Sequence, residues 1–175
     1  MKIALYGFMG AGKSVLGKAL AKKLNWHFVD LDEEIMAFTG KTINEIFADE
    51  GEVTFRKIEH RVLKEIVKRN EENLVFSLGG GTIISPANRK LLEVKNFKKI
   101  YLNVALQQLI ERLKMDKEKR PLLKDIPEDD FDSYITALFE SRKEHYETYA
   151  DINFKINSED FNAVLERLYQ YFNLN

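Results

Sequence analysis

The chain has 175 residues and a formal net charge of −1, with 27 lysines and arginines against 28 aspartates and glutamates, and it contains no cysteine. This balance argues against a protein that binds nucleic acid or an anionic membrane by its charge, and the lack of cysteine excludes disulfides, thiolate metal sites and a cysteine nucleophile. No apolar run approaches the ~18–20 residues that cross a bilayer, and no basic-then-apolar leader precedes the first predicted strand, so we expect a cytoplasmic protein. The length predicts a single domain over residues 1–175, and we expect it to be a monomer.

Strand-like and helix-like segments alternate along the chain. The predicted strands are residues 2–6, 27–31, 73–78, 99–104 and 152–156. The predicted helices are residues 13–24, 32–38, 43–49, 53–69, 86–94, 106–115, 131–149 and 159–172. Thr42 and Glu45 have the spacing of a capping box before the third helix. Such alternation predicts parallel strands joined by helical crossovers, and therefore an α/β protein with three α/β/α layers.

The first predicted strand runs into Gly7-Phe8-Met9-Gly10-Ala11-Gly12-Lys13-Ser14, a complete G-x-x-x-x-G-K-[ST] phosphate-binding loop followed by a helix. The glycines allow a tight turn in which successive N–H groups converge on an anion, at the positive end of that helix. Lys13 can reach the β- and γ-phosphates of a nucleotide, and the Ser14 hydroxyl can ligate Mg²⁺. The residues that we predict to bind the nucleotide here are Gly10, Ala11, Gly12, Lys13, Ser14 and Val15.

Two acidic residues, Asp30 and Asp32, end the second predicted strand. Period-2 alternation puts them on one face, where they suit metal organisation and activation of a hydroxyl. The alternative is that Asp32 only caps the following helix. We favour the functional interpretation because two carboxylates at a sheet edge would be costly without a cation. The third predicted strand ends in Gly79-Gly80-Gly81 rather than in the metal-organising aspartate of many P-loop NTPases, so Asp30 is the predicted metal ligand.

The glycine run at 79–81 predicts that another group approaches the backbone closely there. Arg56 and Glu59 lie three residues apart on a predicted helix and can therefore pair. This pair is either a surface ion pair or a carboxylate that orients a guanidinium for bidentate anion recognition, and the sequence leaves the two open.

Two insertions depart from the minimal pattern, residues 32–69 and the polar segment 115–130. Both connect to the carboxyl end of the sheet, where open α/β sheets bind ligands, so they are predicted to bind the acceptor and to form a lid. Arg120 lies in the lid segment, beside Pro121, which would stiffen the turn. Arg142 lies four residues before Tyr146. Taken alone, either arginine is more typical of a protein surface.

These elements in this order resemble the shikimate kinase family, and they span essentially the whole chain. The resemblance rests on the phosphate-binding loop at 7–14, D-L-D at 30–32, F-R-K-I-E at 55–59, G-G-G at 79–81, R-P-L-L at 120–123 and R-K-E-H-Y at 142–146. It implies a P-loop kinase fold with a five-stranded parallel sheet in the order 2-3-1-4-5. It also implies ATP-dependent phosphorylation of the 3-hydroxyl of shikimate, in the pathway to chorismate and the aromatic amino acids.

Carried over by position, the resemblance implies a role for each matching residue. Asp32 would hold the acceptor hydroxyls, and Asp30 would organise Mg²⁺ with Ser14. Arg112 would lie near the adenine, and Leu78 stands where family members often carry threonine. The residues that would bind shikimate are Asp32, Arg56, Gly80, Gly81 and Arg142, with the arginines on its carboxylate. The residues that would be catalytic are Lys13, Asp32 and Arg120, with Lys13 and Arg120 facing the phosphates of ATP.

Other P-loop proteins remain as alternatives. A gluconate kinase would share the loop and the acid, and a nucleoside monophosphate kinase would need arginines aimed at an acceptor phosphate. A regulatory GTPase would need an N-K-x-D motif and a D-x-x-G after the third strand, neither of which is present. An assembly or transport ATPase fits poorly with the short chain and the lid-like segment.

Overall fold

The computed structural model describes residues 1–69, 71–120, 122–157 and 159–173, and its centre is a five-stranded parallel sheet in the order β2-β3-β1-β4-β5. The strands are β1 (Lys2–Tyr6), β2 (His27–Asp30), β3 (Leu74–Ser77), β4 (Phe97–Val104) and β5 (Ile152–Ile156). The central strands β1 and β3 are buried almost throughout, as expected for a parallel sheet covered on both faces. The predicted fold class and strand order are confirmed.

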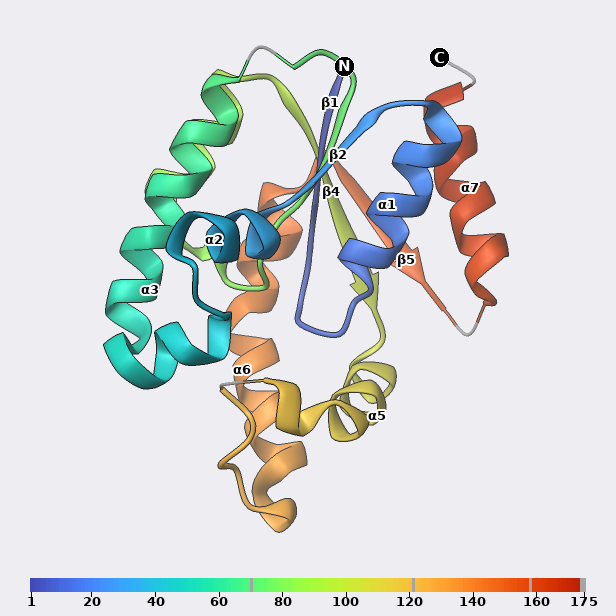
Figure 1. Cartoon of the computed structure of the whole chain (residues 1–175). Coiled ribbons are helices and arrows are strands. Elements are labelled where there is room, and N and C mark those ends of the chain that lie inside the picture. Colours follow the sequence, from blue (N-terminus) through green and yellow to red (C-terminus); the bar gives the residue numbers. More distant parts are fainter. Residues whose placement is uncertain (70, 121, 158, 174–175) are drawn as a thin grey trace.

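Helices cover both faces of the sheet. They are α1 (Lys13–Leu24), α2 (Leu31–Thr39), α3 (Ile43–Lys68), α4 (Pro86–Val94), α5 (Leu106–Met115), α6 (Glu128–Tyr149) and α7 (Phe161–Asn173), with short 3₁₀ turns η1 (Thr82–Ile84) and η2 (Lys117–Lys119). Figure 1 shows α1 and α7 together on one side of the sheet and α3 and α6 on the other. No helix in the described ranges is long and apolar enough to cross a membrane.

The boundary between β2 and α2 differs from the prediction. The strand ends at Asp30, and Leu31, predicted as its last residue, already belongs to α2. Asp30 occupies the N-cap of this helix, and its Oδ1 accepts a hydrogen bond from the N–H of Asp32 at 3.0 Å. The prediction that Asp30 and Asp32 alternate along one strand is therefore wrong, and the capping role considered for Asp32 belongs to Asp30.

Other boundaries differ less. The predicted helices 43–49 and 53–69 form the two arms of α3, which is interrupted at Gly51, where φ is 76° and ψ is 170°. The capping box of Thr42 and Glu45 is confirmed at its start. Strand β4 begins at Phe97, two residues before the predicted start at 99, because Phe97 is buried and pairs with Lys2 of β1. Helix α6 begins at Glu128 instead of 131, because an acidic first turn suits the positive helix end.

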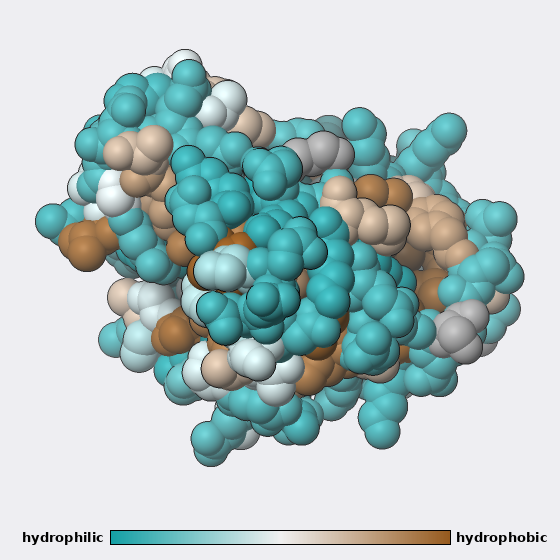
Figure 2. Space-filling model, turned by 90° about the horizontal axis from the view of Figure 1, so that it is seen from below, coloured by the Kyte–Doolittle hydropathy of each residue, from teal (hydrophilic) through white to brown (hydrophobic). Residues whose placement is uncertain are grey.

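Adjacent strands bring the predicted site residues to one end of the sheet. Ser77 of β3 lies opposite Leu5 of β1 and Asp30 of β2. The segments that follow these strands are the phosphate-binding loop, the glycine run and the start of α2, and they therefore leave the sheet side by side. Seen from below, the molecule shows a mostly hydrophilic surface, with hydrophobic side chains in patches between the polar ones (Figure 2).

Candidate active site

The phosphate-binding loop has the backbone that its glycines predict. Gly10 and Gly12 adopt φ of 80° and 84°, in the left-handed region, and Gly12 is the N-cap of α1 without a side-chain cap. The first N–H groups of the helix are therefore open to an anion. The Lys13 ammonium donates to the carbonyls of Gly7 (3.2 Å) and Phe8 (3.0 Å). Burial lowers the pKa of Lys13 to about 8, although the charge of Asp32 opposes this change.

A cavity of about 380 Å³ lies over this loop. The predicted nucleotide-binding residues that line it are Gly10, Gly12, Lys13, Ser14, Val15, Arg112 and Arg120. Ala11 is buried instead, and its N–H donates within the loop to the carbonyl of Phe8 at 3.2 Å. Arg112 reaches the loop from α5 and donates to the carbonyl of Gly10 at 3.2 Å. The loop and α5 thus enclose one chamber, which we call the donor cavity.

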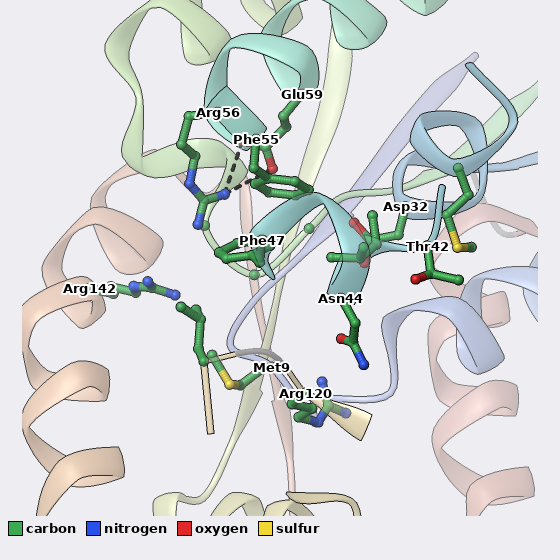
Figure 3. Close-up of a pocket in the computed structure, with 16 residues that line it drawn as sticks. Met9, Asp32, Thr42, Asn44, Phe47, Phe55, Arg56, Glu59, Arg120 and Arg142 are labelled. Atoms are coloured by element: carbon green, nitrogen blue, oxygen red, sulfur yellow. Dashed lines mark hydrogen bonds and ion pairs between the residues drawn. The ribbon is translucent and has the colours of Figure 1, made fainter. Parts of the chain in front are cut away.

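A second cavity, of about 390 Å³, lies beside the first and is called the acceptor cavity below (Figure 3). All of the predicted shikimate-binding residues line it, namely Asp32, Arg56, Gly80, Gly81 and Arg142. Phe47 and Phe55 from α3 form an apolar wall, with ring centroids 4.6 Å apart. In Figure 3, Arg56 and Arg142 lie on the same side of the cavity, and Asp32 lies across from them.

The two cavities meet at a shared boundary. The residues that line both are Met9, Asp32, Gly80 and Arg120. Asp32 is partly buried there, and burial together with the nearby charge of Asp30 raises its pKa to about 6. Arg120 comes from the segment predicted to be a lid, and burial lowers its pKa. Pro121, expected to stiffen that segment, lies outside the described residues. An acid and a cation therefore stand at the boundary between the two cavities.

Arg56 is held by carboxylates on its own helix. Its Nη1 donates to both oxygens of Glu59, at 3.2 Å and 3.1 Å, and its Nη2 donates to Glu52 at 3.0 Å. Glu59 is 1% exposed, whereas the side chain of Glu52 is 49% exposed. Of the two interpretations left open by the sequence, the geometry matches a carboxylate that orients a guanidinium, because Glu59 is buried and Arg56 lines a cavity.

Close approach explains the glycine run. A Cβ at Gly81 would lie 2.6 Å from Nη2 of Arg56, and one at Gly80 would lie 3.2 Å from the backbone N of Met9. A Cβ at Gly79 would lie 3.1 Å from Oε1 of Glu59. The expectation that another group approaches this backbone is confirmed, and the approaching groups are the Arg56–Glu59 pair and the phosphate-binding loop.

Helix α6 is fixed to the glycine run by a tyrosine. The hydroxyl of Tyr146, which is fully buried, donates to the carbonyl of Gly80. Burial raises the pKa of this tyrosine to about 12, so that its hydroxyl remains a donor. Arg142 lies one helical turn earlier on the same helix and lines the acceptor cavity. The tyrosine thereby sets the position of Arg142 relative to Gly80.

Asp30 has the features of a metal ligand. It is 6% exposed, and while Oδ1 caps α2, the buried Oδ2 has no hydrogen-bond partner. Asp30 lines the donor cavity together with Ser14. The described ranges hold no cluster of three or more histidine, cysteine, aspartate or glutamate side chains suited to a metal. Mg²⁺ does not require one, because it is commonly held by one or two protein oxygens together with phosphates and water.

Some residues of the site were not found from the sequence. Met9 and Asn44 line the acceptor cavity, and Thr82 contacts Glu59. Met9 stands at a variable position of the phosphate-binding loop, and its place in that loop could have predicted that it lies near the bound ligands. Asn44 lies at a helix start and Thr82 in a turn, and no sequence pattern marks either of them as a site residue.

Comparison with known proteins agrees with this geometry. A family model described as shikimate kinase matches residues 9–172. The shikimate kinase of Flavobacterium psychrophilum is 41% identical over 83% of this chain and 84% of its own length, and that of Legionella pneumophila is 40% identical over 97% and 93%. Among solved structures, shikimate kinase from Acinetobacter baumannii in complex with shikimate has a TM-score of 0.87 and 34% identity, covering 97% of this chain and 91% of that one. Shikimate kinase from Aquifex aeolicus has a TM-score of 0.77 and 36% identity, covering 96% and 94%.

Proposed function

Because the chain belongs to the shikimate kinase family, we propose that it transfers the γ-phosphoryl group of ATP to the 3-hydroxyl of shikimate, giving shikimate 3-phosphate and ADP. The chain is a kinase, and phosphorylation of shikimate serves aromatic biosynthesis. The observation that carries the proposal is the pair Arg56 and Arg142 at one end of an acceptor cavity whose other end, at Asp32, adjoins the phosphate-binding loop.

The acceptor cavity suits a polyhydroxylated carboxylate. Two guanidinium groups match a carboxylate, which can accept paired hydrogen bonds from their planar forks. Asp32 can accept hydrogen bonds from ring hydroxyls at the far end, and Phe47 and Phe55 can pack against the ring. An acceptor held by its carboxylate at one end would present a hydroxyl to the boundary with the donor cavity.

Transfer itself requires positioning and charge stabilisation more than covalent chemistry by the protein. In our proposal Lys13 and Arg120 stabilise the charge on the transferring phosphoryl group. Lys13 must then leave the carbonyls of Gly7 and Phe8 when ATP enters. Asp32 orients the acceptor hydroxyl and takes up its proton as the new bond to phosphorus forms. Segment 115–130 closes over the phosphates and excludes water.

The unpartnered Oδ2 of Asp30 and the Ser14 hydroxyl suit Mg²⁺ bound with the nucleotide. The cation would neutralise charge on the β- and γ-phosphates. For this chain we propose that Ser14 and Asp30 hold it, that Arg112 lies against the adenine, and that the chain acts as a cytoplasmic monomer without nucleic-acid or membrane partners.

One assay separates this proposal from the other P-loop kinases. ADP release is measured with shikimate, gluconate and nucleoside monophosphates offered separately, and the phosphorylated carbon is located by NMR of the product. Turnover with shikimate and phosphorus coupling to the proton on C3 is expected. Faster turnover with gluconate or a nucleotide, or phosphorylation at another hydroxyl, contradicts the proposal.

A further inference from the structure

Thr82 is buried behind the acceptor cavity, in turn η1, and contacts the carboxylate that holds Arg56. Its Oγ1 donates to Oε1 of Glu59 at 2.7 Å, and both residues are buried, with exposures of 0% and 1%. We propose that Thr82 is a positioning residue for the acceptor: it holds Glu59 in place, and Glu59 aims the guanidinium of Arg56 at the acceptor carboxylate. This inference rests on the proposed function, because it requires an acceptor that carries a carboxylate.

A buried carboxylate needs more than one donor. Burying a charge is costly unless it is both paired and hydrogen-bonded. Glu59 does not have Arg56 to itself, because Arg56 also donates to Glu52 through Nε at 3.3 Å and through Nη2 at 3.0 Å. The side chain of Arg56 is also 30% exposed, so that solvent competes for its donors. The Thr82 hydroxyl is a donor away from solvent, and its β-branched side chain has few rotamers. Thr82 therefore fixes Glu59 more rigidly than the ion pair alone would.

The two glutamates leave an N–H of the Arg56 guanidinium for the acceptor. Arginine has five N–H donors in a planar fork. The contacts with Glu52 occupy Nε–H and one donor on Nη2, and Nη1 donates to both oxygens of Glu59. Nη2 has a second N–H, and this charged donor can bind an oxygen of the acceptor carboxylate. Movement of Glu59 would rotate the guanidinium, and with it this N–H, away from the acceptor.

Thr82 is itself held in place. Its N–H donates to the carbonyl of Gly79 at 3.2 Å, and its own carbonyl accepts from Nδ2 of Asn88 at 2.9 Å. Asn88 is buried and its Oδ1 lies 2.7 Å from Nδ1 of His60. A Cβ at Gly79 would lie 2.9 Å from the Thr82 hydroxyl and 3.1 Å from Glu59, so the contact between them depends on a bare backbone at position 79. The position of the Thr82 hydroxyl is thus fixed by hydrogen bonds of its own backbone and by close contact with the glycine run.

The test removes the hydroxyl with and without a change of shape. Thr82→Val keeps the branched shape, and the pair Thr82→Ser and Thr82→Ala differs only in the hydroxyl. Calorimetry gives the Kd of shikimate, of its carboxamide and of ATP for each folded variant. Because the lost hydroxyl donates to a buried carboxylate, Thr82→Val and Thr82→Ala are expected to raise the Kd of shikimate by about 10- to 100-fold. Thr82→Ser should stay within a few-fold of wild type, and the Kd values of ATP and of the carboxamide should hardly change.

A double variant tests the route through Glu59. In a Glu59→Gln background, adding Thr82→Val should change the Kd of shikimate by less than about threefold, because residues that act through one contact are not additive. Equal shikimate affinity in Thr82→Ser and Thr82→Ala overturns the inference, as does a parallel loss for ATP and the carboxamide. Wild-type protein that binds the carboxamide as well as the acid contradicts the proposed function instead, whatever the Thr82 variants do.

Discussion

Replacing Gly81 with alanine should impair binding of the acceptor while leaving the fold almost unchanged. The backbone at Gly81 has φ of −108°, which alanine adopts freely, so no strain is expected in the main chain. The new Cβ would lie 2.6, 2.8 and 2.9 Å from Nη2, Cζ and Nη1 of Arg56, and these atoms belong to the end of a flexible side chain. The guanidinium must therefore move by roughly 1 Å to restore ordinary contact distances.

A displacement of this size is enough to disrupt a bidentate hydrogen bond to the acceptor, but it should hardly change the free energy of unfolding. A misplacement of about 1 Å can cost up to ~10²-fold in activity, so we expect KM for shikimate to rise about 10- to 100-fold. KM for ATP should stay within about twofold, because Gly81 does not line the donor cavity. Steady-state kinetics with each substrate varied in turn gives the two KM values, and thermal unfolding gives the stability of the variant.

Gly80→Ala is the matched control, since its Cβ would lie 3.2 Å from the backbone N of Met9 in the phosphate-binding loop. This variant should raise KM for both substrates. A folded Gly81→Ala variant with wild-type KM for shikimate would refute the conclusion that the guanidinium lies against this glycine and reads the acceptor there.

Four further outcomes follow from the site. Lys13→Ala should lower kcat by about 10³-fold or more in a folded protein, since phosphoryl transfer depends on charge stabilisation; wild-type turnover would exclude Lys13 from that role. Asp30→Asn should change the dependence of the rate on Mg²⁺ and Mn²⁺ concentration, whereas Asp32→Asn should lose activity that no metal restores. Identical metal titrations of the two variants would contradict separate roles for Asp30 and Asp32. Arg142→Lys should weaken shikimate binding about 10-fold with ATP affinity unchanged, because an ammonium lacks the planar fork, and calorimetry that finds equal shikimate affinity would count against a bidentate contact. Amide hydrogen exchange in segment 115–130 should slow when ATP analogue and shikimate are both bound, and unchanged exchange would argue against a lid.

The sheet and the phosphate-binding loop could be predicted because their signals are local. A strand, a glycine-rich loop and a helix follow one another within residues 2–24, and this order is the one that a phosphate-binding loop requires. The end of β2 was predicted one residue too late, since apolar and acidic residues alternate across Leu31 whether the backbone is extended or helical. In the structure, Asp30 is still extended, and the hydrogen bond from the Asp32 N–H to Asp30 marks the start of the helix.

The acceptor cavity was predicted less completely, because its contacts join distant segments. The spacing of Arg56 and Glu59 predicted a pair but gave no information on burial, which depends on η1 packing against α3. Thr82 carries no motif, and its importance arises from a hydrogen bond across 23 positions of the chain. Asn44 likewise lines the cavity from the start of α3, together with Met9 of the phosphate-binding loop.

The bond between Tyr146 and the carbonyl of Gly80 bears on the order in which the site assembles. It spans 66 positions, and the bond from Tyr6 to the carbonyl of Tyr146 spans 140. Contacts this far apart in the chain close late, because their loop entropy is lost before they contribute stability. A nascent chain emerging from the ribosome therefore carries the whole phosphate-binding loop long before α6 arrives with Arg142. The phosphate-binding loop and Arg142 thus come from segments that are synthesised far apart, and only the complete fold brings them together.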